Sequence, residues 1–219
     1  MYSVIRNQHH QKMILLIAAF AIFMDGLDSS IVNIALPVIA GDFGVDISGS
    51  SWVVMAYLLI IAGFILAFGK IADQGRIRQV FSAGFAVFAL GSFICVVSPN
   101  LACMIAARAV QGLGASMIAA AAPLLVTRFL PEGMRGLGMG VIATTGGVAL
   151  TFGPPIGGLI TAYIGWHWIF MINVPVGIAA IILGRSAIPA PAVPAKRERF
   201  DFFGTFVLFF TIAGGIMTL

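Results

Sequence analysis

The sequence predicts an all-α protein that crosses a membrane several times. Apolar residues make up 60% of the 219-residue chain, and charged residues make up only 9%. Apolar runs recur at lengths near the roughly 20 residues that a helix needs to cross a hydrocarbon layer about 30 Å thick. Of the twelve Lys and Arg residues, eleven fall on one side of these runs. We therefore expect a multi-pass helical membrane protein rather than a soluble domain.

Seven apolar runs are candidate membrane spans, separated by short connections. They cover residues 13–37, 50–69, 80–98, 101–127, 136–162, 168–188 and 202–219. This pattern divides the chain into a cytoplasmic N-terminus (1–12), a six-helix bundle (13–188), a cytoplasmic linker (189–201) and a seventh helix (202–219). The first run is too long for the apolar region of a cleaved signal peptide, so we expect it to stay as an anchor.

Basic residues predict the orientation of these spans. With a cytoplasmic N-terminus, the eleven flanking basic residues all become cytoplasmic: Arg6, Lys12, Lys70, Arg76, Arg78, Arg128, Arg135, Arg185, Lys196, Arg197 and Arg199. The opposite connections hold Asp42, Asp46 and His167 but no Lys or Arg. The positive-inside rule then places the N-terminus in the cytoplasm and the chain in the cytoplasmic (plasma or inner) membrane. Because the basic residues flank spans, we expect anionic lipid of the bilayer as their partner and no nucleic acid.

Polar side chains inside spans mark the helices that face an interior, because an ionised group in hydrocarbon costs several kcal/mol. The first span contains Asp25, Asp28, Ser29, Ser30 and Asn33, and the fourth contains Arg108, Gln111 and Ser116. The second, third and sixth spans contain few polar groups, and these lie mostly toward span ends, among them Trp52, Tyr57, Ser82, Ser92 and Asn173. We expect the first and fourth helices to line a substrate cavity with Asp25, Asp28, Asn33, Arg108 and Gln111.

Depth along the helices brings three of these groups to one layer. At 1.5 Å per residue, Asp28 lies roughly 13 Å below the outer surface, Arg108 about 10 Å and Gln111 about 15 Å, with Asp25 one turn deeper than Asp28. Two carboxylates three residues apart in a low-dielectric site cannot both ionise cheaply, so one Asp is expected to hold a proton. Asp28, Arg108, Gln111 and Asp25 are therefore candidates for proton coupling. The alternatives are a static ion pair that orients two helices and, for Asp25, a water-exposed position without a coupling role.

Two stretches resemble a known family of transporters. Leu27 to Pro37 resembles the LDxTxVNxALP signature in the first helix of the fourteen-helix drug:proton antiporters of the major facilitator superfamily, with Ser30 in place of Thr. Arg108 to Gly112 is similar to the RxxQG motif in the fourth helix of this family, where the motif is associated with proton coupling.

A cytoplasmic loop carries a third resemblance. Residues Gly69 to Arg78 resemble the loop GxLADRxGRK, and the candidate conformational residues are Gly69, Asp73, Arg76 and Arg78. The second Gly and the Arg after it each come one residue early. The resemblance implies that Asp73 acts as a latch to a helix of the second half of the transporter.

Further motifs follow in the family's order. Gly153, Pro154, Gly157 and Gly158 match the antiporter motif GPxxGG of the fifth helix, where close helix packing without a gating role is the alternative. Trp166 to Gly177 is very similar to WRWIFxINVPIG, with His167 in place of Arg. Phe200 to Gly204 resembles the FDxxG start of the seventh helix.

This resemblance implies an N-terminal half: a six-helix bundle of two inverted three-helix repeats plus a seventh helix, with the C-terminal half or a second copy as partner. It also implies proton-coupled efflux of small lipophilic, cationic compounds, driven by the proton gradient without a cofactor. A truncated, non-transporting product or an interaction subunit is the alternative. No residue pattern indicates an enzyme or a metal site. A disulfide between Cys95 and Cys103 stays open.

Overall fold

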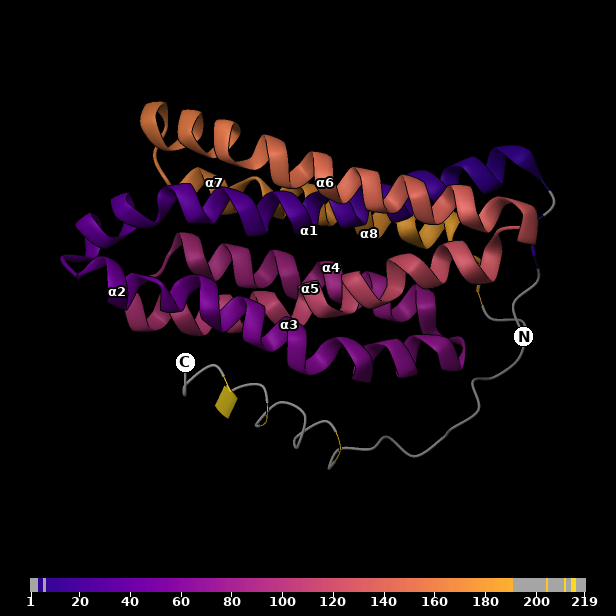
Figure 1. Cartoon of the computed structure of the whole chain (residues 1–219), viewed down its shortest axis with the longest axis horizontal. Helices are drawn as coiled ribbons and strands as arrows, with labels where there is room; N and C mark the ends of the chain where they lie inside the picture. Colours follow the sequence, from indigo (N-terminus) through magenta and orange to yellow (C-terminus); the bar gives the residue numbers. More distant parts are fainter. Residues whose placement is uncertain (1–3, 6, 191–203, 205–210, 212–213, 216–219) are drawn as a thin grey trace.

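The computed structural model describes residues 4–5, 7–190, 204, 211 and 214–215, and this part of the chain folds into long helices that lie side by side (Figure 1). The main helices are α1 (Gln8–Phe43), α3 (Trp52–Ile71), α4 (Ile77–Val96), α5 (Leu101–Phe129), α6 (Glu132–Tyr163) and α8 (Asn173–Ala187). Short helices connect them: α2 (Ile47–Ser50), the π-helical turn η1 (Ala72–Arg76) and α7 (His167–Met171). The predicted all-α fold is confirmed.

Five helical stretches are long and apolar enough to cross a membrane. One of them, Ile47–Val96, spans 50 residues and folds back on itself at Gly75, so the five stretches make six passes. The chain is thus a multi-pass integral membrane protein. The predicted linker and seventh span fall almost entirely outside the described residues.

Helix α1 begins and ends at well-defined caps. The Asn7 side chain accepts a hydrogen bond from the backbone N–H of His9 at the start, and Gly44 ends the helix with φ 63° and ψ 34°. The predicted end near Pro37 was wrong, because α1 continues through Pro37 to Phe43. A proline removes one backbone hydrogen bond, whereas the left-handed glycine stops the helix.

The chain reverses between α3 and α4 at Gly75. This residue has φ 97° and ψ 16°, a backbone conformation that is unfavourable for residues with a side chain. The glycine that comes one residue early relative to the family loop is therefore the residue at which the backbone turns.

The pairing of the helices follows a two-fold pattern. Helix α1 packs along α6, and α5 packs along α3; α1 also contacts α5, and α4 contacts α8. Exchanging the first three passes with the last three turns the α1–α6 pair into the α5–α3 pair and leaves the other two contacts unchanged. These pairings are the ones expected of two inverted three-helix repeats, whereas the extensive α4–α5 contact is matched only by a much smaller contact of α8 with α1.

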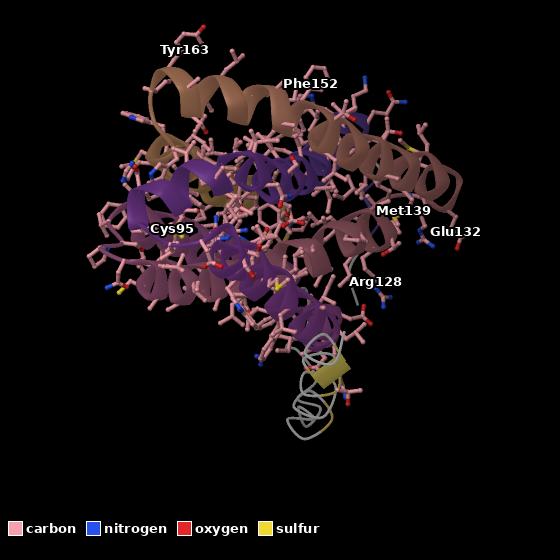
Figure 2. The ribbon with its side chains drawn as sticks, turned by 60° about the vertical axis from the view of Figure 1, so that its left-hand side comes forward. Cys95, Arg128, Glu132, Met139, Phe152 and Tyr163 are labelled. Carbon is pink, nitrogen blue, oxygen red and sulfur yellow. The ribbon has the colours of Figure 1, made fainter. Side chains whose placement is uncertain are left out.

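The two ends of the bundle differ in the charged residues that they contain. The start of α1, the η1 turn, the α5–α6 connection and the end of α8 share one end (Figure 1). Arg128 and Glu132 mark this end in Figure 2, and Tyr163 lies near the other. The described basic residues other than Arg108 belong to the first end, whereas Asp42 and Asp46 belong to the second.

Candidate functional site

A buried ion pair joins α1 to α5 in the interior of the bundle. The Arg108 Nη1 atom donates to Asp28 Oδ2 at 2.7 Å. Arg108 is 0% exposed and Asp28 is 2% exposed, so neither group reaches solvent or lipid. Because each charge is removed from water, the pair is stable only when the two partners stay together.

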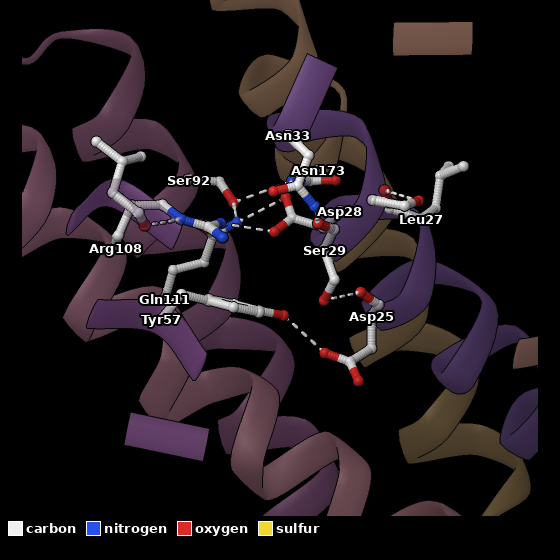
Figure 3. Close-up of polar contacts among 12 residues, drawn as sticks. Asp25, Leu27, Asp28, Ser29, Asn33, Tyr57, Ser92, Arg108, Gln111 and Asn173 are labelled. Carbon is white, nitrogen blue, oxygen red and sulfur yellow. Dashed lines mark hydrogen bonds and ion pairs between the residues drawn. The ribbon is translucent and has the colours of Figure 1, made fainter. Parts of the chain in front are cut away.

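Three neutral polar side chains complete the surroundings of Asp28 (Figure 3). Gln111 Nε2 and Asn173 Nδ2 both donate to Asp28 Oδ1, at 2.9 Å and 2.6 Å. The same two amides donate to Ser92 Oγ, at 2.6 Å and 3.3 Å. The network thus connects four helices: α1 through Asp28, α4 through Ser92, α5 through Gln111 and α8 through Asn173.

Arg108 is held from several directions. Its Nη1 also donates to Gln111 Oε1 at 2.5 Å, and its Nε donates to the carbonyl oxygen of Val53 at 3.1 Å. The guanidinium carbon lies 3.9 Å from the centre of the Tyr57 ring, a cation–π contact. Among the described residues the buried Nη2 has no hydrogen-bond partner. Arg108 therefore keeps one donor free inside the bundle.

Asp25 lies apart from this network. Its Oδ1 accepts a hydrogen bond of 2.7 Å from the Tyr57 hydroxyl, toward which its side chain points (Figure 3). Tyr57 therefore connects the two acidic residues: its ring packs on Arg108, the partner of Asp28, and its hydroxyl donates to Asp25. Asn33, the remaining expected cavity residue, is exposed and donates to the backbone oxygen of Ser29.

Ser92, Asn173 and Tyr57 were not predicted as members of the site, because they lie toward the ends of their spans in the sequence. The depth calculation contained the missing signal: Ser92 is six residues from the outer end of its predicted span and Asn173 is five residues from the start of its own. At 1.5 Å per residue both lie roughly 8–9 Å below the surface, close to the layer of Arg108. Being near a span end is thus compatible with belonging to the buried layer.

Glycines allow the helices to approach at this network. A Cβ atom on Gly91 would lie 2.6 Å from the backbone nitrogen of Gln111, beside Ser92. A Cβ atom on Gly112, the last residue of the RxxQG motif, would lie 2.8 Å from the carbonyl oxygen of Tyr57. Close backbone contact at these two points brings α4 and α3 against α5.

The antiporter motif of α6 packs directly on the first-helix signature. A Cβ on Gly153 would collide with Ser30 Oγ, and one on Gly157 would lie 3.0 Å from the Ile31 carbonyl oxygen. Ser30 also donates to the carbonyl oxygen of Ala149 at 3.3 Å. Gly158 is less tightly packed, because a Cβ atom added to it would lie 3.9 Å from the Ile34 side chain. Pro154 lies inside α6.

The loop residues lie far from the buried pair, at the basic end of the bundle. Asp73 Oδ1 accepts hydrogen bonds from Arg128 Nε and Nη2, at 2.9 Å and 2.5 Å. Both side chains are close to half exposed, so the pair is a surface contact between η1 and the end of α5. Gly69 has open space around it.

The two cysteines are free thiols. Cys95 is buried in the bundle, whereas Cys103 is exposed near the start of α5. Over the part of the chain that the structure describes, no group of three or more His, Cys, Asp or Glu side chains could hold a metal ion.

The sequence model of the Major Facilitator Superfamily matches residues 18–218. The chain belongs to this superfamily. Its transporters are generally not enzymes, and the six passes of the described bundle fit an N-terminal half of the superfamily fold.

Curated relatives of the chain include transport and resistance proteins. A riboflavin transporter, RibZ, of Clostridioides difficile (strain 630) is 38% identical over 191 residues, which are 87% of this chain and 42% of that protein. A putative multidrug resistance protein, MdtD, of Cronobacter sakazakii (strain ATCC BAA-894) is 37% identical over 197 residues, 90% of this chain and 41% of that protein. MdtD of Escherichia coli (strain K12 / DH10B) is 36% identical over 203 residues, 93% of this chain and 42% of that protein. The chain thus spans well under half the length of the relatives it matches.

Proposed function

We propose that the chain forms the N-terminal half of a proton-coupled exporter of lipophilic, cationic compounds. The observation that carries the proposal is the buried Asp28–Arg108 pair. Charged side chains inside a membrane protein are energetically costly, so their presence indicates a role in transport. The match to proteins named for multidrug resistance supports export of drugs.

Proton coupling follows from what protonation would do to this pair. A proton on Asp28 removes the negative charge and leaves Arg108 buried without a counter-ion, which is strongly unfavourable. The bundle can relieve this by moving α1 relative to α5, or by letting a substrate or water reach the free Nη2 of Arg108. Proton binding and helix movement are thereby linked.

Asp25 is the candidate contact for a cationic substrate. Its carboxylate is bound by one hydroxyl, that of Tyr57, rather than by a guanidinium, so it keeps attraction for a positive charge. A ligand that displaced Tyr57 from Asp25 would also disturb the ring under Arg108. Tyr57 is in this proposal the side chain that connects the substrate contact to the proton site.

The proposal includes the membrane location and the orientation of the protein. The protein lies in the cytoplasmic membrane with its N-terminus in the cytoplasm, because the basic end of the bundle then faces the cytoplasm. A second bundle, encoded in the same polypeptide or supplied by a second copy, completes the central cavity.

Dye efflux from everted membrane vesicles tests the proposal, using the gene as it is encoded, including any sequence after Leu219. We expect Asp28→Asn to abolish efflux that depends on the pH gradient, while Lys12→Gln, at an exposed position of the basic end, leaves it unchanged. Unchanged proton-dependent efflux in Asp28→Asn would remove Asp28 from the mechanism. Absence of any efflux from a natural gene that ends at Leu219 would favour the non-transporting alternative.

The relative named as a riboflavin transporter favours a second candidate, transport of a neutral heterocyclic vitamin. Radiolabelled riboflavin flux in the same vesicles separates the two. If riboflavin moves and cationic dyes do not, the cationic-substrate part of the proposal is wrong. Asp25→Asn should then have little effect, because a neutral substrate gains nothing from the carboxylate charge.

A further inference from the structure

A cavity of about 450 Å³ opens between α4 and α8 at the basic end of the bundle. Its polar lining is Gly75, Arg76, Arg78, Gln79, Ser82 and Arg185. The volume lies within the roughly 300–1,000 Å³ typical of small-molecule sites. The cavity is separate from the Asp28 network, which occupies the interior toward the other end of α4.

Three arginines line this cavity, and no carboxylate of the described residues lines it. Every carboxylate of the described residues is bound elsewhere. Asp25 binds Tyr57, Asp28 binds Arg108, and Asp73 binds Arg128. Asp42 accepts from Trp166, Asp46 caps α2, and Glu132 pairs with Arg135. Arg76, Arg78 and Arg185 therefore form a local excess of positive charge, which favours an anionic ligand.

Ser82 supplies a second, independent indication of a ligand. Ser82 is among the residues that line the cavity and is 9% exposed, and its buried Oγ has no hydrogen-bond partner among the described residues. A serine hydroxyl in a helix commonly donates to the carbonyl four residues earlier, and a buried hydroxyl left without a partner is unfavourable. An acceptor oxygen in the cavity would satisfy it.

The wall of the cavity changes from charged to apolar along both helices. On α4, Arg78 is followed one turn later by Ser82 and Ala83 and a further turn later by Ala86, which is about 12 Å from Arg78 along the axis. On α8, Ile181 lies one turn from Arg185. Beyond the cavity the same faces continue with the exposed apolar residues Leu90 and Ile178.

This gradient matches an amphiphile at the membrane surface. Arg76 ends η1, Arg78 is in the first turn of α4 and Arg185 is in the last turn of α8, the level at which helix ends meet lipid headgroups. The exposed apolar face leads from there into the hydrocarbon layer. A free phosphate ion would use the arginines and Ser82 but none of the apolar groove.

We propose that the α4–α8 cavity binds the phosphate headgroup of an anionic phospholipid. Arg76, Arg78 and Arg185 neutralise the phosphate, Ser82 donates a hydrogen bond to one of its oxygens, and an acyl chain lies over Ala83, Ala86 and Ile181. Basic cavities between helices on the cytoplasmic side are a known mode of binding anionic lipid. The site fixes α4 to α8 at the end of the bundle that contains the turn at Gly75.

Native mass spectrometry of the purified chain in detergent, titrated with phosphatidylglycerol or with phosphatidylcholine of the same acyl chains, tests the site. We expect one phosphatidylglycerol to bind more tightly than phosphatidylcholine. Removing each arginine should weaken it about five-fold, so Arg78→Gln/Arg185→Gln loses about 25-fold. Ser82→Ala, which keeps the helix and the charges, should weaken it about five-fold.

Arg135→Gln is the matched control, because it removes one guanidinium from the same end but outside the cavity. Phosphatidylglycerol binding should be unchanged in this variant. Equal binding of the two lipids, unchanged binding in both cavity variants, or an equal loss in the control would each overturn the proposal. Displacement of phosphatidylglycerol by excess inorganic phosphate at similar affinity would show a free-anion site instead.

Discussion

At the scale of single residues, Arg108 shows what the buried network requires. It is among the largest fully buried side chains of the described residues, and its charge is balanced by Asp28 alone. Coulomb attraction inside a protein is strong, but the cost of removing two charges from water is comparable. The pair therefore contributes little net stability while making the loss of one partner severe.

We predict a strongly non-additive response when the two charges are removed. Asp28→Asn and Arg108→Gln should each lower the free energy of unfolding by about 3–5 kcal/mol, because each leaves one buried charge uncompensated. The double variant should be more stable than either single variant. The measurement is unfolding in mixed detergent and SDS micelles, followed by circular dichroism. Simple addition of the two single losses would contradict an energetically coupled pair.

At the scale of elements, the contact of α6 with α1 depends on the absence of side chains. Gly153 and Gly157 lie against Ser30 and Ile31, so the antiporter motif and the first-helix signature form one interface. In a bilayer such close packing replaces the hydrophobic effect as the source of helix association. Packing and gating remain compatible roles, because a tight contact also excludes ions.

Two alanine substitutions on α6 test this interface. Gly153→Ala should lower the free energy of unfolding by about 1–3 kcal/mol, because the new methyl group meets Ser30 and the backbone of Ile31. Gly147→Ala on the same helix has open space and should be neutral or stabilising by up to about 1 kcal/mol through helix propensity. Micelle unfolding of both variants measures the difference. Equal effects would show that α6 is not seated as described.

The turn between α3 and α4 allows a similar comparison. Gly75→Ala should be destabilising by about 1–2 kcal/mol, because alanine is disfavoured at φ 97°. Gly69→Ala, in helical backbone with open space, should be tolerated. Thermal unfolding in detergent would show the difference, and a tolerated Gly75→Ala would mean that the turn is not at this residue.

At the scale of the whole molecule, the six passes place connections alternately at two ends that differ in charge. Membrane insertion retains Lys- and Arg-rich connections on the cytoplasmic side. The exposed thiol of Cys103 lies at the opposite end from Arg135, and Cys95 is buried, so the two ends can be labelled separately.

We predict that a membrane-impermeant maleimide labels Cys103 in intact cells. In a Cys103→Ser background, Arg135→Cys should be labelled only in everted vesicles. Labelling with the opposite sidedness would reverse the proposed orientation. Cys95 should react only after denaturation, because it is buried.

Much of this fold was predictable from the sequence because each pass needs an apolar run of fixed length. Depth arithmetic also brought Asp28, Arg108 and Gln111 to one layer, where the structure has them, although it counted the depth of Asp28 from Pro37 and α1 ends six residues later. The depths of residues were compared only for the two most polar helices, however, so Ser92 and Asn173 were not assigned to the layer of Asp28. Helix ends were less predictable, as Pro37 shows, because one lost hydrogen bond does not stop a helix.

The sequence by itself determined the membrane class, the passes, the separation of charge and the family, since these depend on composition and order along the chain. Only the tertiary structure decided that Asp25 binds Tyr57 rather than Arg108, that Ser92 and Asn173 share Asp28, and that Arg76, Arg78 and Arg185 meet at one cavity. Those contacts depend on the rotation of each helix about its axis. That rotation is set by close packing at glycines such as Gly91, Gly112 and Gly153, between residues distant in the sequence.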